Sequence, residues 1–157
     1  MSNYQTNSQT QGFSKKESGF TMIELLITMA IVAVLTTISL FALRGARESA
    51  RDARRKADLE TIRSGLEIYK ADCNTYPTVS PLPSPLVGSG TPSTCLATNT
   101  YVQRIPTDPA GGNYFYLSAG STYILCSTLE DPPTPSLDTS GCGTCAAGAC
   151  QYKVINP

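Results

Sequence analysis

The chain has 157 residues with 12 basic and 12 acidic side chains, so it has no net charge at neutral pH and can hold one modest domain plus an anchor. A chain this close to neutral lacks the basic surface that nucleic-acid binding needs. It contains no histidine and no tryptophan, which removes the commonest general base and the usual zinc and haem ligand. We therefore expect a non-enzyme with no catalytic residue, no metal site, no cofactor and no nucleic-acid partner.

The first strong signal is an uncharged apolar run from Leu25 to Leu43. As a helix at about 1.5 Å per residue, this run would rise roughly 28 Å, close to the thickness of a bilayer's hydrocarbon core. A buried helix of a soluble domain would show a polar stripe every three to four residues. Here the polar side chains are hydroxyls that can bond to the helix's own carbonyls, namely Thr28, Thr36, Thr37 and Ser39. The run predicts a membrane-spanning helix.

Glu24 directly precedes this run and lies one turn inside the apolar segment that begins at Phe20, where an ionised carboxylate is costly unless a cation neutralises it or it is solvated at the headgroup level. Before the block lies a polar leader that ends in Gly19. A secretory signal peptide places its small-residue cleavage site after the apolar block, whereas here the small residues precede it. Cleavage after Gly19 would leave the apolar segment on the mature chain.

The stretch Gly19-Phe20-Thr21-Met22-Ile23-Glu24-Leu25-Leu26 resembles the class III signal of type IV prepilins and type II secretion pseudopilins. The resemblance implies that a prepilin peptidase cuts after Gly19 and that Phe20 becomes the N-methylated terminus. It implies that Glu24 is an assembly carboxylate, which neutralises the terminal ammonium of a neighbouring subunit. The chain would first be held in membrane lipid and then join a homo-oligomeric helical filament, together with other pilins and an inner-membrane assembly platform.

The location of the C-terminal part follows from its cysteines. All six lie after the apolar run, which is typical of disulfides in an oxidising compartment. The basic residues that follow the run would place this part in the cytoplasm by the positive-inside rule. We give the cysteines and the resemblance more weight than the positive-inside rule. We therefore predict a single-pass membrane protein with an extracytoplasmic head that reaches a cell-surface pilus after assembly.

The expected fold is α+β and pilin-like, with one long helix packed on a small antiparallel sheet. We divide the chain into a removed cytoplasmic leader (1–19), a transmembrane and filament-core helix (20–44), its amphipathic continuation (45–72) and a globular head (73–157). The helix should run from Phe20 to Ala71 because no proline occurs before Pro77. A bulky stripe at helical spacing should dock the head, and comprises Leu59, Ile62, Leu66 and Tyr69.

Two other features of the continuation are predicted to face outward. A small-residue face suits close approach of another helix and comprises Ala46, Ala50, Ala53 and Ala57. The arginine-rich segment between Arg44 and Lys56 is interpreted as a solvated helix face.

In the head, residues 73–100 lack periodicity and predict a loop that Cys73 and Cys95 could close. Residues 101–130 and 151–155 predict the antiparallel sheet, including a hairpin whose turn contains Gly120. Residues 131–150 predict a proline-rich and cysteine-rich loop.

The cysteines are predicted to form disulfides, with fifteen connectivities open, and are Cys73, Cys95, Cys126, Cys142, Cys145 and Cys150. Two alternatives remain at this point. Cys142-x-x-Cys145 could be a redox motif, and a zinc ion could take four ligands from Cys126, Cys142, Cys145 and Cys150. Some major pseudopilins bind calcium, but the loop acids show no dense ligand pattern to support it here, and they are Asp108, Glu130, Asp131 and Asp138.

The main functional prediction is a structural subunit of a type IV pilus that serves adhesion, twitching motility or DNA uptake, because the disulfide-rich tail resembles pilins. The alternative is a pseudopilin of a type II secretion system. A second alternative is a membrane-anchored extracytoplasmic redox or enzyme domain that uses the loop from Cys142 to Cys150.

Overall fold

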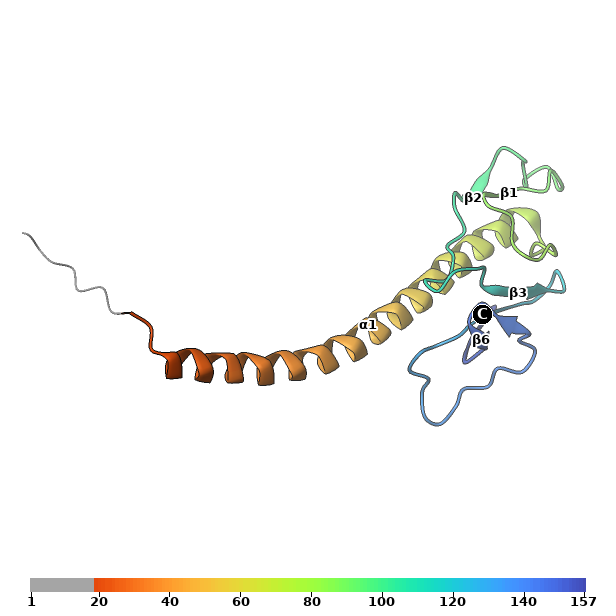
Figure 1. The fold of residues 1–157 in the computed structure, drawn as a ribbon. Helices are drawn as coiled ribbons and strands as arrows, with labels where there is room; N and C mark the ends of the chain where they lie inside the picture. Colours follow the sequence, from red (N-terminus) through yellow and green to blue (C-terminus); the bar gives the residue numbers. More distant parts are fainter. Residues whose placement is uncertain (1–18) are drawn as a thin grey trace, which may run out of the picture. The chain divides into compact units, whose positions relative to one another are not determined.

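The computed structural model describes residues 19–157 and contains one helix, α1 (Met22–Cys73, 52 residues), followed by short strands (Figure 1). The leader expected at 1–19 lies outside the described residues, apart from Gly19. The helix starts and ends two residues later than the pattern predicted. It ends at Cys73, because the next residue, Asn74, has a positive φ of 62° that breaks the helical path. The Asn74 backbone N–H still donates to the Lys70 carbonyl at 2.9 Å.

The chain divides into two compact units, one ending at Phe41 and the other comprising Ala42–Pro157. In the described part of the first unit every residue is exposed, including the whole of α1 up to its boundary. The second unit, which we call the head unit, carries the hydrophobic core. The structural boundary falls three residues before the one expected at 44/45, since the unit boundary follows contacts rather than charge.

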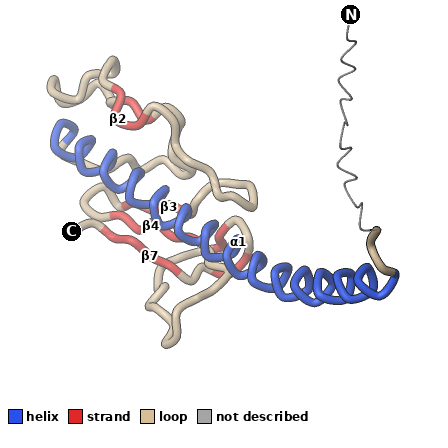
Figure 2. The backbone as a smooth tube through the Cα atoms, turned by 90° about the vertical axis from the view of Figure 1, so that its left-hand side faces the viewer, coloured by secondary structure: helices blue, strands red, loops and turns tan. Residues whose placement is uncertain are grey.

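The main sheet of the head unit has three antiparallel strands in the order β3-β4-β7. They are β3 (Phe115–Ser118), β4 (Tyr123–Ser127) and β7 (Tyr152–Ile155), with Tyr116 opposite Leu125 and Leu125 opposite Val154. The predicted hairpin is confirmed as β3 and β4, with Gly120 at a φ of 86° in the turn. Figure 2 shows the second half of α1 lying along this sheet.

Two smaller sheets differ from the sequence prediction. β1 (Leu86–Val87) lies in the segment predicted to be only a loop, and it pairs with β2 (Thr100–Val102) rather than leaving β2 to the main sheet. The predicted sheet over 101–130 was therefore wrong for its first strand. The reason is tertiary: Val102 packs directly over Gly65 of α1, where a side-chain Cβ would come within 2.1 Å of Val102 Cγ2. A second hairpin, β5 (Thr144–Cys145) with β6 (Gly148–Ala149), lies in the predicted cysteine-rich loop.

The core confirms the predicted docking stripe. Leu59, Ile62 and Leu66 are at most 1% exposed and Tyr69 is 5% exposed. They pack against residues from the strands and from the loop after the helix, among them Leu86, Val102, Tyr116, Tyr123, Leu125 and Val154. Burial of such side chains contributes about 1.5–3 kcal/mol each relative to exposure, so this stripe fixes the helix in the head unit.

Candidate functional site

The residues assigned to processing and assembly lie at the start of the described chain. Gly19 and Phe20 precede α1, and the Phe20 side chain is 78% exposed. Glu24 lies in the first turn of α1, where a carboxylate is favourable because of the exposed backbone N–H groups. These positions leave Gly19 and Phe20 in an accessible, non-helical segment directly before a helix.

Thr21 is a residue of this segment whose role the sequence analysis missed. Its Oγ1 accepts a hydrogen bond of 3.3 Å from the backbone N–H of Glu24 and so caps the first turn of α1. The spacing Thr21-x-x-Glu24 is the signature of a capping box and could have been found in the sequence. The helix start is thereby set just after Phe20.

The polar groups within the apolar part of α1 are satisfied by the helix itself. Thr36 Oγ1 donates to the Val32 carbonyl at 2.7 Å, and the corresponding hydroxyls of Thr28, Thr37 and Ser39 donate to carbonyls at 2.8–2.9 Å. The surface left to the surroundings is apolar, with side chains such as Leu26 and Phe41 at 68% and 71% exposure. By length and composition α1 can cross a membrane. This supports single-pass anchoring.

A buried ion cluster in the head unit is centred on Arg55, which the sequence analysis wrongly placed on a solvated face. Its guanidinium is 1% exposed and donates to Asp52 at 2.7 Å, to Asp108 at 3.0 and 3.2 Å, and to Glu130 at 2.9 Å. Arg51, also on α1, forms a second ion pair with Glu130. The cluster ties the start of the amphipathic helix to two loops that are distant in sequence.

The contacts in the cluster shift the pKa values of Arg55, Asp52 and Glu130. Burial alone would lower the pKa of Arg55, but the hydrogen bonds to Asp108, Asp52 and Glu130 outweigh it and raise that pKa. Burial opposes ionisation of Asp52, yet the backbone N–H groups of Asp131 and Glu130 donate to it and its pKa is lowered. The hydrogen bonds from Arg51 lower the pKa of Glu130 to about 2. Arg55, Asp52 and Glu130 are therefore charged at neutral pH.

Tyrosine hydroxyls form a second set of contacts between the helix and the rest of the head unit. Tyr76 and Tyr123 both donate to Glu67, at 2.9 and 3.0 Å, and Tyr114 donates to Asp58 at 2.7 Å. Burial, followed by these hydrogen bonds, raises the pKa of Tyr76 to about 12 and raises the pKa of Tyr114 as well. Glu67 and Asp58 on α1 therefore hold strand β4, the loop after the helix and the segment before β3.

All six cysteines are joined in disulfides, which confirms the predicted disulfide-stapled head. The bridges are Cys73–Cys95, Cys126–Cys142 and Cys145–Cys150. The two cysteines of the Cys142-x-x-Cys145 motif belong to different bridges, so they do not form a redox pair with each other. The four candidate zinc ligands are likewise engaged in two disulfides, which leaves no thiolate among them to bind the ion.

Asp108, Glu130 and Asp138 do not fit a calcium site. Asp108 and Glu130 are apart in the sequence but close in the fold, where both carboxylates pair with the Arg55 guanidinium. Asp138 instead pairs with Lys153 at 2.6 Å, and the hydrogen bond from Lys153 lowers the pKa of Asp138 to about 2. Carboxylates that already neutralise a side-chain cation do not supply the free oxygen ligands that calcium needs.

The comparison with known proteins agrees with both units. Residues 14–40 match the prokaryotic N-terminal methylation motif, and residues 42–133 match the family of type II secretion system protein G. The chain is 30% identical over 109 residues to type II secretion system core protein G of Aeromonas hydrophila, covering 68% of this chain and 76% of the relative. The same protein of Escherichia coli is 30% identical over 121 residues, covering 74% and 83%.

The core protein G of Vibrio cholerae is 31% identical over 108 residues, covering 68% of this chain and 74% of the relative. The matched region extends over more than half of the chain and contains the docking stripe, Arg55, Asp108 and the hairpin of the main sheet. It ends at residue 133, before the hairpin of β5 and β6 and the last three cysteines of the chain. The chain therefore belongs to the type II secretion system protein G family, within the wider family of type IV pilins and pseudopilins.

Proposed function

We propose that this chain is a structural, non-catalytic pseudopilin subunit of a type II secretion system. The observation that carries the proposal is the match of residues 42–133 to protein G, together with the similarity to core protein G of several bacteria. This match favours a pseudopilin of a type II secretion system, the alternative given above, over a subunit of a type IV pilus.

The mechanism follows from the two units. A prepilin peptidase would cut after Gly19 and Phe20 would be N-methylated, as the match to the methylation motif suggests. The exposed apolar surface of α1 would be covered first by lipid and then by the same helix of other subunits, because apolar surface of this extent is unfavourable in water. Glu24 would neutralise the terminal ammonium of a neighbouring subunit, and the extracytoplasmic head would form the filament surface.

The experiment is deletion of the gene in its own host, followed by measurement of secreted proteins in the medium and of filaments sheared from the cells. We expect loss of secretion with surface filaments unchanged. Complementation with the Gly19→Val or Glu24→Val variant should fail, whereas Gly45→Ala should restore secretion, because Gly45 lies in open space on α1. Mass analysis should find the mature chain beginning at methylated Phe20, and a chain retaining residues 1–19 would contradict the processing step.

The type IV pilus remains a second candidate because of a specific observation, the disulfide-stapled region after residue 133. Loss of surface filaments with normal secretion in the deletion strain would select this candidate. In either case the chain would act as a polymerising subunit.

A further inference from the structure

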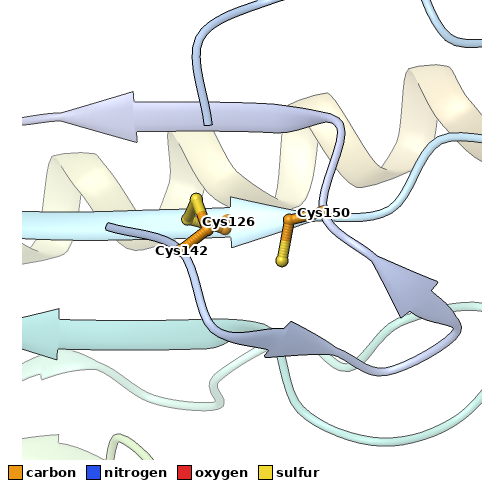
Figure 3. Close-up of side chains that lie close together, drawn as sticks. All are labelled: Cys126, Cys142 and Cys150. Carbon is orange, nitrogen blue, oxygen red and sulfur yellow. A yellow bond between two sulfur atoms is a disulfide. The ribbon is translucent and has the colours of Figure 1, made fainter. Parts of the chain in front are cut away.

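Three cysteine sulfurs from two different disulfides lie together at one end of the main sheet. The Sγ atoms of Cys126, Cys142 and Cys150 are all within 4.8 Å of one another, and Figure 3 shows the three side chains close together. Cys126 is on the central strand β4 and is fully buried, while Cys142 is half-buried. Cys126 is bonded to Cys142, and Cys150 is bonded to Cys145.

Cys150 is held in this position by contacts other than its own bridge. The backbone N–H of the next residue, Gln151, donates to the Ser127 carbonyl at 3.0 Å, and the Gln151 Oε1 accepts from the backbone N–H of Leu129 at 2.8 Å. The Cys150 Sγ lies 3.3 Å from the Gly143 carbonyl, directly after Cys142. Opening the Cys145–Cys150 bridge would therefore leave the Cys150 sulfur beside the other disulfide.

We propose that Cys150 is a thiol–disulfide exchange site for the Cys126–Cys142 bridge. An external dithiol reduces the Cys145–Cys150 bridge with two electrons and is itself oxidised to a disulfide. Cys150 then loses its proton to solvent, and its thiolate attacks Cys126 Sγ. The Cys126–Cys142 bond breaks, the electron pair leaves on Cys142, and that thiolate takes a proton from water. The second step forms one disulfide and breaks one, so it needs no further reductant.

The direction of the exchange follows from burial. A thiolate is more stable where water can reach it, so Cys142 is a better leaving group than the fully buried Cys126. The product has a Cys126–Cys150 bridge and thiols at Cys142 and Cys145.

The exchange would change how the proline-rich segment 131–141 is tethered. In the present pairing Cys126–Cys142 fastens the end of this segment to β4 across a sequence separation of 16 residues. Cys150 leads into β7, which is already paired with β4 through Cys126 and Lys153. Moving the bridge to Cys150 would leave the segment held by noncovalent contacts alone, among them the ion pair of Asp138 with Lys153 and the hydrogen bond from the Asp131 backbone N–H to Asp52.

The test compares two variants of the full-length chain, purified from membranes in detergent, that lose the same bridge. In Cys145→Ser the free thiol is Cys150, next to the other disulfide, whereas in Cys150→Ser it is Cys145, which is outside the three-sulfur group. Free thiols are alkylated after acid quenching and mapped by mass spectrometry. We expect about tenfold more label on Cys142 in Cys145→Ser than in Cys150→Ser.

A second measurement uses the unsubstituted chain, so that it does not depend on the folding of either variant. The unsubstituted chain is treated under native conditions with a limiting dithiol and mapped in the same way. Label on Cys142 and Cys145 together, with a Cys126–Cys150 bridge, supports the exchange. Label on Cys145 and Cys150 with the Cys126–Cys142 bridge intact, or label on Cys126, overturns it.

Discussion

Leu35 and Leu66 belong to the same helix, yet Leu35 is 59% exposed and Leu66 is fully buried. The difference follows from the two units of the chain. Before Phe41 the helix is apolar all round and buries none of its side chains in the described part of its own unit. After Ala42 it is amphipathic, and its bulky stripe is covered by the head. The first unit therefore depends on a surface supplied from outside the chain, whereas the head unit carries its own core.

The largest expected effect comes from breaking the buried ion cluster of the head. Arg55→Met leaves the carboxylates of Asp52 and Asp108 buried without their cation, so we expect the free energy of unfolding to fall by about 3–5 kcal/mol. The matched control is Arg54→Met, because the Arg54 side chain is 69% exposed and should contribute about 0–1 kcal/mol. Urea unfolding followed by near-ultraviolet circular dichroism measures both. Equal effects of the two variants would contradict the cluster.

The contrast between the two leucines can be tested directly. Leu66→Ala opens a cavity in the head and should cost about 2–5 kcal/mol in the same unfolding measurement. Leu35→Ala should leave unfolding of the head unchanged, because Leu35 belongs to the other unit. In cells Leu35→Ala should reduce secretion, because Leu35 lies on the exposed apolar surface of α1, although the head stays folded. A loss of head stability in Leu35→Ala would show that the two units are coupled.

Replacing either of two glycines of α1 by alanine should change stability, but in opposite directions. Gly65→Ala places a Cβ against Val102 and should destabilise the head by about 1–3 kcal/mol. Gly45→Ala meets nothing within 4 Å and should stabilise the helix by up to about 1 kcal/mol through its higher helix propensity. Thermal unfolding of the two variants side by side gives the comparison. A stabilised Gly65→Ala would mean that β2 can move away from the helix.

The smallest expected effect is the response to acid, because Glu130 is partly open to solvent. Its pKa is lowered to about 2, and the pKa of Asp52 is also lowered, so the folded head binds fewer protons than the unfolded chain. Their contribution to stability is thus fully present above about pH 5 and is lost as the pH falls toward 2. Unfolding measured between pH 7 and 2 should show this loss. Glu130→Gln should flatten the profile, and an unchanged profile would contradict the assignment.

Much of this organisation could be predicted from local sequence patterns. The apolar run, the proline-free helix and the stripe from Leu59 to Tyr69 depend on residue type and helical period, which do not need distant contacts to be recognised. The hairpin around Gly120 was predictable for the same reason, since its strands and turn are adjacent in the chain. The predicted main sheet was wrong only in including the segment of β2, which pairs with β1 instead.

The parts that the sequence could not give are those in which distant residues meet. The helical period places Arg55 on the same face as Leu59 and Ile62, unlike Arg54, but only the loops that carry Asp108 and Glu130 decide that its guanidinium is enclosed by carboxylates. The same holds for the disulfides: six cysteines identify a stapled head, but their pairing depends on which strands become neighbours. The sequence by itself determined the anchor, the helix and the presence of disulfides, since these follow from composition and period. Tertiary structure alone decided the ion cluster, the place of β2 and the meeting of Cys126, Cys142 and Cys150, because each depends on how the chain folds back onto α1 and β4.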